Sequence, residues 1–152
     1  MYTPMPPPKI IAVVGPTASG KTAVGIALAR AFDGEIVCAD SRTIYRGLDI
    51  GTAKSMGDRV GAGFDESIKP APIGDIKSLF AERPRLVEGV PHWGIDIANP
   101  DETLSVAEYQ KYADGVIAGI LERGHVPIIV GGTGLYIRAI IDRPNFTDVP
   151  PN

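Results

Sequence analysis

The chain has 152 residues, 44% of them hydrophobic and 22% charged, with one cysteine and a formal net charge of −3 at pH 7. This length and composition suit one hydrophobic core, and no apolar run approaches the roughly 18 residues that would cross a membrane. The negative charge argues against binding nucleic acid through the overall charge, and the lone cysteine excludes an internal disulfide and favours a cytoplasmic protein.

The first elements follow a loose start. Residues 1–9 are rich in proline and lack the apolar core of a signal peptide, so we expect a flexible lead-in. The apolar run Ile10–Val14 predicts a strand, and Ala23–Phe32 predicts a helix with Gly34 as its left-handed terminator. Between them, Gly15–Thr22 reads GPTASGKT, which is the pattern of a phosphate-binding loop in a strand-to-helix turn.

This loop predicts a site for an oligophosphate. Its backbone N–H groups and the positive end of the helix would surround the phosphates. Lys21 would contact the outer phosphates, and the Thr22 hydroxyl would hold a Mg²⁺ that bridges them. The alternative is a turn that binds nothing and exposes its lysine. The expected diphosphate- or nucleotide-binding residues are Gly15, Pro16, Thr17, Ala18, Ser19, Gly20, Lys21 and Thr22.

The second strand is predicted at Glu35–Ala39, with Cys38 buried in it. Asp40 follows directly, and ligands of open α/β sheets bind beyond the carboxyl ends of the strands. A carboxylate there could accept a proton from a nucleophile or hold a metal through water. It could instead be a helix cap, with Asp40 or Ser41 beginning a short helix. On the residues alone, both interpretations remain open.

Glycines and prolines interrupt residues 55–91, with one weak helical patch at 73–80. We expect a surface excursion there, either a lid over the phosphate site or a decoration without function. The third strand is predicted at Trp93–Ile97. The chain has two histidines and no cysteine cluster near either, so the sequence predicts no transition-metal site.

The clearest helix is predicted from about Val106 to Arg123. Ser105 and Glu108 form a capping box, and Gly124 ends the pattern. Its apolar side chains recur at helical spacing and are expected in the core: Val106, Tyr109, Ala113, Val116, Ile117 and Ile120.

The fourth strand, Val126–Val130, precedes a turn with three glycines and the hydroxyl of Thr133, and a last helix, Leu135–Ile141, follows. So many glycines suggest that the backbone comes close to a ligand. Strands that alternate with helices predict an α/β fold: a P-loop NTPase-like parallel sheet with helices on both faces, spanning residues 10–142.

Four stretches together resemble the tRNA dimethylallyltransferases, also called tRNA isopentenyltransferases. They are GPTASGKT, ADSRTIYRGLDIGTAK at 39–54, IDIANPDE at 95–102 and VPIIVGGTGLYIRAII at 126–141. The resemblance covers most of residues 10–142. It implies that residues 143–152 begin a truncated linker to a helical insertion domain, which this chain lacks, and that a later segment completes the core of such enzymes.

The resemblance implies transfer of the dimethylallyl group of dimethylallyl diphosphate to N6 of an adenosine next to the anticodon of tRNA. It implies Mg²⁺ as the cofactor, dimethylallyl diphosphate and tRNA as partners, no membrane partner and a monomer. Asp40 matches the general base, and Lys21 and Thr17 complete the expected catalytic set. The expected tRNA-binding residues are Asp40, Ser41, Arg42, Thr43 and Thr133.

Three alternatives share parts of this pattern. A P-loop kinase of nucleotides or small metabolites would use the same loop, with Lys21 and Thr22. An isopentenyltransferase acting on free AMP, ADP or ATP would share more of it. A non-catalytic module that binds a diphosphate or tRNA would bind without turnover.

Overall fold

The computed structural model describes residues 9–16, 20–44, 84–95, 97, 104–132 and 134–142. Five strands and four helices lie in this part of the chain. In order they are β1 (Ile11–Val14), α1 (Lys21–Phe32), β2 (Gly34–Cys38), α2 (Ser41–Ile44), β3 (Arg85–Val87), β4 (Val90–Trp93), α3 (Val106–Glu122), β5 (Val126–Gly131) and α4 (Gly134–Ile141).

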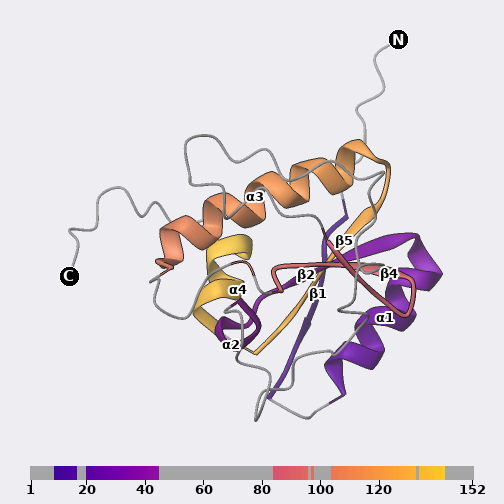
Figure 1. Cartoon of the computed structure of the whole chain (residues 1–152), viewed down its shortest axis with the longest axis horizontal. Helices are drawn as coiled ribbons and strands as arrows, with labels where there is room; N and C mark the ends of the chain where they lie inside the picture. The colour runs from indigo at the N-terminus through magenta and orange to yellow at the C-terminus, as the bar shows by residue number, and fades with distance from the viewer. Residues whose placement is uncertain are drawn as a thin grey trace.

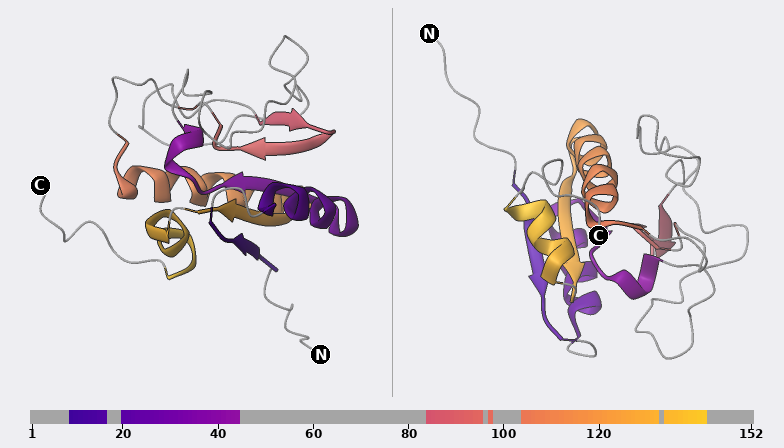
Figure 2. Two further views of the ribbon diagram at one scale, coloured as in Figure 1. Left: turned by 90° about the horizontal axis from the view of Figure 1, so that it is seen from below. Right: turned by 90° about the vertical axis from the view of Figure 1, so that its left-hand side faces the viewer.

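The strands form one sheet in the order β1-β5-β2-β4-β3. The first three neighbouring pairs are parallel, with Val13 opposite Val130 and Ile36 opposite both Ile128 and His92. Strand β3 is antiparallel to β4, and Figure 2 shows this hairpin at one edge of the sheet and β1 at the other. The predicted α/β fold with a mainly parallel sheet is confirmed, and β3 adds one antiparallel strand at its edge.

Helices cover both faces of the sheet, as predicted. Alternate residues of β2 and β5 point to opposite faces, so Ile36 and Ile128 contribute to a core with α1. Val37 and Ile129 contribute to a second core with α3 and α4. Figure 1 shows α1 on one side of the sheet and α3 with α4 on the other.

The predicted third strand, Trp93–Ile97, is displaced. Strand β4 ends at Trp93, and Gly94 follows with φ of 87°. A Cβ on Gly94 would lie 2.9 Å from the Cys38 carbonyl oxygen, so the chain turns here against the end of β2. Ile95 and Ile97 are buried without being part of the strand. In the sequence these apolar residues stand at every second position, which is the pattern typical of a strand.

The expected surface excursion, residues 55–91, is wrong at its end, since residues 85–87 and 90–91 lie in the sheet. Residues 55–83, including the helical patch at 73–80, lie outside the described part of the chain. The same is true of residues 1–8 and 143–152. In the described residues, none of the helices has the length and apolar character to cross a membrane.

The ends of the two long helices differ in how well the sequence predicted them. Helix α3 has the predicted capping box, in which Glu108 N donates to Ser105 Oγ at 3.1 Å and Ser105 N donates to the Glu108 carboxylate at 2.9 Å. Helix α1 instead ends at Asp33, with φ of 55°, rather than at Gly34. Gly34 already belongs to β2, where a Cβ would lie 2.7 Å from the Val126 carbonyl oxygen.

Candidate functional site

The site begins where the carboxyl ends of four strands converge. A Cβ on Gly131 would overlap the Ala39 carbonyl group. Only glycine at this position therefore lets the end of β5 come this close to the end of β2. A Cβ on Gly132 would lie 3.1 Å from the Gly15 carbonyl oxygen, at the start of the phosphate loop. At these two positions the glycine turn after β5 comes close to other parts of the backbone. The predicted approach to a ligand stays a prediction.

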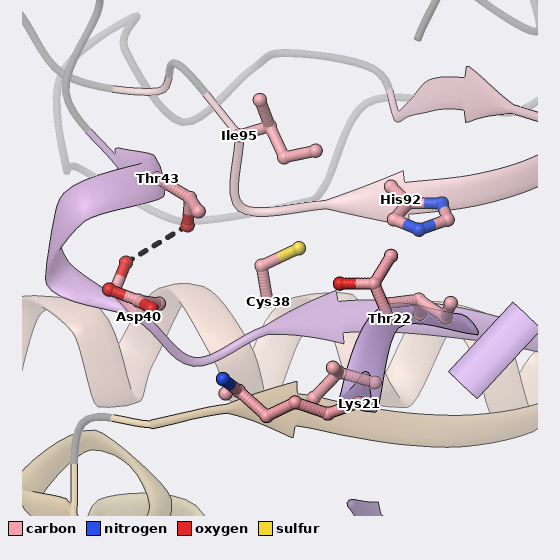
Figure 3. A pocket seen from close by; sticks show the side chains of 10 residues that line it. Lys21, Thr22, Cys38, Asp40, Thr43, His92 and Ile95 are labelled. Carbon is pink, nitrogen blue, oxygen red and sulfur yellow. Dashed lines mark hydrogen bonds between the residues drawn. The ribbon is translucent and has the colours of Figure 1, made fainter. Parts of the chain in front are cut away.

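A small pocket lies at this edge of the sheet, with a cavity of about 40 Å³. The residues labelled in Figure 3 come from α1, β2, β4 and the segments that follow these two strands. The cavity has room for roughly three water molecules at 10–15 Å³ each. The lining residues are Lys21, Thr22, Ile36, Cys38, Asp40, Thr43, His92, Ile95, Val130 and Gly131.

Lys21 and Thr22 occupy the first turn of α1, directly after Gly20. Gly20 has φ of 82°, a left-handed conformation that brings the loop onto the helix. The Lys21 ammonium donates to the Pro16 carbonyl oxygen at 3.0 Å. In Figure 3 its amino group extends toward the end of the pocket where Asp40 lies. The amino end of α1, with its positive dipole, thus faces the pocket.

Asp40 connects β2 to α2 and lines the same pocket. Its carbonyl oxygen accepts hydrogen bonds from the Thr43 N–H at 3.2 Å and from the Thr43 hydroxyl at 2.9 Å. The short helix after Asp40 is therefore real, and Asp40 stands at its start. This position is compatible with both predicted roles of Asp40, the helix cap and the carboxylate of a site, because Asp40 precedes α2 and also lines the pocket beside Lys21 and Thr22.

Cys38 is a buried strand residue, as predicted. Burial raises the pKa of its thiol to about 12, and the nearby Asp40 carboxylate adds to this effect. At neutral pH the thiol stays protonated, so Cys38 is unsuited to act as a nucleophile.

His92 is a pocket residue that the sequence analysis missed. It is 2% exposed, and its Nδ1 lies 2.9 Å from the Val90 carbonyl oxygen. Burial lowers its pKa, while the contact with Val90 and the charge of Glu88 oppose this change. Its Nε2 is buried and makes no hydrogen bond to the described residues. The only signal in the sequence was its place beside the displaced third strand.

Of the predicted site residues, Lys21, Thr22, Asp40 and Thr43 come together around one pocket. Ser41 begins α2 next to it. The predicted residues 17–19 and Thr133, and the side chain of Arg42, lie outside the described part of the structure. Their roles, and those of the described residues, stay predictions.

A second polar cluster lies at the amino ends of the strands and was also missed. The buried Glu35 carboxylate accepts hydrogen bonds from Trp93 Nε1 at 2.9 Å and from Arg123 Nε and Nη2 at 2.9 and 2.8 Å. Nδ1 of His125 lies 2.7 Å from it. These groups satisfy one another, which is typical of a structural network.

Comparisons with known proteins identify the family of the chain. The family model described as IPP transferase matches residues 72–152, which is more than half of the chain. A tRNA dimethylallyltransferase of Salinispora arenicola is 46% identical over 143 residues, a match that covers 93% of this chain and 34% of that protein.

Two solved structures are also similar. The tRNA isopentenylpyrophosphate transferase of Bacillus halodurans has a TM-score of 0.69 at 40% identity, covering 95% of this chain and 39% of that one. The tRNA isopentenylpyrophosphate transferase of Staphylococcus epidermidis has a TM-score of 0.64 at 41% identity, covering 88% of this chain and 34% of that one. The chain thus spans little more than a third of the length of these relatives.

Proposed function

The chain belongs to the IPP transferase family, and from this premise we propose that it carries the prenyl-donor site of a tRNA dimethylallyltransferase. The reaction would move a dimethylallyl group from dimethylallyl diphosphate to N6 of an adenosine next to the anticodon of tRNA. The observation that carries this proposal is that Lys21, Thr22 and Asp40 line one pocket at the carboxyl ends of the strands.

The diphosphate would bind at the amino end of α1. The Lys21 ammonium would leave the Pro16 carbonyl oxygen, which it contacts at 3.0 Å, and pair with the diphosphate oxygens. The N–H groups of the first turn of α1 would add to this interaction. Both interactions grow as negative charge develops on the leaving diphosphate, so they would stabilise the transition state more than the ground state.

A divalent metal, Mg²⁺ by our proposal, fits the donors at this place. The Thr22 hydroxyl supplies an oxygen atom of the kind that Mg²⁺ prefers, and the cavity of about 40 Å³ has room for an ion with some of its water. When bound, the ion would neutralise charge on the leaving diphosphate.

Asp40 would act as the general base. In the transfer, the bond between the allylic carbon and the diphosphate oxygen breaks and a bond from that carbon to N6 forms. The N6 proton goes to the Asp40 carboxylate, because an exocyclic amine is a weak nucleophile until it loses a proton. The adenine has to leave its stack to reach the site. Thr17, Ser41, Arg42, Thr43 and Thr133 would contribute contacts, as the family resemblance implies.

Substitution of Asp40 tests this proposal. In a transfer-competent full-length form, Asp40→Asn should slow single-turnover transfer of a labelled dimethylallyl group by about 10²–10⁴-fold and leave diphosphate affinity nearly unchanged. Asp114→Asn, on α3, is the matched control and should keep the wild-type rate. Normal transfer by Asp40→Asn would leave Asp40 with a helix-capping role alone.

A further inference from the structure

His92 presents a hydrogen-bond acceptor that nothing in the described structure uses. Its Nδ1 faces the Val90 carbonyl oxygen at 2.9 Å, and a carbonyl oxygen can only accept, so Nδ1 carries the hydrogen. Burial lowers the pKa of the ring, which favours the neutral form. The buried Nε2 therefore has a free lone pair, and it makes no hydrogen bond to the described residues. Buried polar atoms in proteins nearly always have a hydrogen-bond partner, so we expect Nε2 to gain one when the pocket holds its ligand.

The fold directs this nitrogen toward Thr22. His92 pairs with Ile36 across β4 and β2, so both side chains point to the face that α1 covers. Thr22 lies in the first turn of α1, and both residues line the cavity of about 40 Å³. In Figure 3 the His92 ring lies over the Thr22 side chain, with a ring nitrogen on that side. The Thr22 methyl group is drawn toward the ring and its hydroxyl away from it, so the Thr22 side chain has to rotate for the hydroxyl to reach this nitrogen.

Among the side chains that line this pocket, Thr22 is the hydroxyl donor best suited to His92. The other hydroxyl, on Thr43, donates to the Asp40 carbonyl oxygen at 2.9 Å. The Lys21 ammonium donates to the Pro16 carbonyl oxygen and extends toward Asp40. A hydroxyl has one hydrogen and two lone pairs, so an oxygen that binds a cation must direct its hydrogen to another acceptor.

We propose that His92 is a positioning residue for the metal–diphosphate site, whose Nε2 accepts the hydrogen bond of the Thr22 hydroxyl and turns the lone pairs of that oxygen toward a divalent cation. This inference rests on the proposed function, since it deepens the role of the same pocket. A neutral acceptor suits this place because it orients the hydroxyl and adds no charge that would repel the diphosphate.

Calorimetric titration of the 152-residue chain with inorganic pyrophosphate tests the inference, with Mg²⁺ present in one series and a chelator in the other. The wild type should bind more tightly with Mg²⁺. His92→Phe should reduce this magnesium-dependent gain about two- to tenfold and leave the affinity in chelator unchanged. In a Thr22→Val background, His92→Phe should have no further effect. His125→Gln, at the other end of the sheet, is the control and should keep the full gain.

A second measurement uses wild-type His92 and therefore does not depend on whether its variants fold. With ¹⁵N-labelled histidine, the Nε2 resonance of His92 should move when Mg²⁺ and pyrophosphate are added, and should stay in place in Thr22→Val. A merely structural histidine would not respond in this way.

The outcomes separate the two proposals. If His92→Phe keeps the full magnesium-dependent gain, if the losses of His92→Phe and Thr22→Val add, or if the Nε2 resonance does not move, the inference is overturned and the diphosphate site stands. If the wild type binds no pyrophosphate with or without Mg²⁺, the proposed function fails and this inference fails with it.

Discussion

The Glu35 carboxylate lies inside the protein, with its side chain 1% exposed and three donor residues around it. Burial alone would raise its pKa, but hydrogen bonds from Arg123, Trp93 and His125 outweigh burial and hold the pKa below its ordinary value of 4.5. A carboxyl group with a lowered pKa stabilises the folded state above its unfolded pKa. This contribution is lost as the pH falls through the folded pKa.

Glu35→Gln should therefore remove much of the acid sensitivity of the fold. At pH 7 we expect the variant to lose about 3–5 kcal/mol of unfolding free energy, because Arg123 and His125 lose their charged partner. Below pH 4.5 the wild type should lose stability and the difference should shrink. Urea unfolding between pH 3 and 7 measures both effects, with the exposed Glu122→Gln as the control. An equal pH dependence in Glu35→Gln and wild type would contradict this explanation.

At the scale of the element, the end of β5 sets the shape of the pocket. Gly131 meets the Ala39 carbonyl group so closely that a side chain cannot fit, and Ala39 N donates to the Val130 carbonyl oxygen at 2.8 Å beside this contact. The approach of β5 to β2 thus helps to place Asp40 in the pocket that Lys21 and Thr22 also line. Gly134, at the start of α4, has open space where a Cβ would be.

The two glycines should respond to substitution in opposite ways. Gly131→Ala should cost about 1–3 kcal/mol of unfolding free energy, because the backbone of β2 or β5 must shift. Gly134→Ala should be neutral or raise stability by up to about 1 kcal/mol, since alanine favours the helix. Chemical denaturation of both variants checks this difference. If Gly131→Ala is as stable as Gly134→Ala, the close approach at Gly131 does not constrain the fold.

The elements also show what the sequence could predict. Helix α3 was predicted closely because Ser105, Glu108 and Gly124 are local signals that act through neighbouring backbone groups. Strand β4 was displaced because the constraint on Gly94 is the Cys38 carbonyl oxygen, which is distant in the sequence. His92 was missed as a pocket residue for the same reason, since its place depends on its pairing with Ile36. The antiparallel β3 is only three residues long and gave no periodic pattern.

At the scale of the molecule, strand β2 connects two polar clusters with different tasks. Glu35 lies near its amino end in a network of paired charges, and Asp40 follows its carboxyl end in the pocket. The structural network around Glu35 and the pocket around Asp40 thus lie at opposite ends of one strand. The net charge of −3 offers little general attraction for the phosphates of tRNA, so the tRNA contacts of the proposed function would have to be local.

Under the proposed function, the pocket beside Lys21 binds the diphosphate of a prenyl donor. Titration of dimethylallyl diphosphate with Mg²⁺ into the wild-type chain, Lys21→Ala and the exposed control Lys111→Ala tests it most directly. Loss of a charge-assisted hydrogen bond costs about 1.5–3 kcal/mol, so Lys21→Ala should bind about ten- to a hundredfold more weakly, while Lys111→Ala binds like the wild type. Equal affinity of Lys21→Ala and the wild type would contradict the claim. Tight ATP binding with phosphoryl transfer and no affinity for dimethylallyl diphosphate would identify a kinase instead.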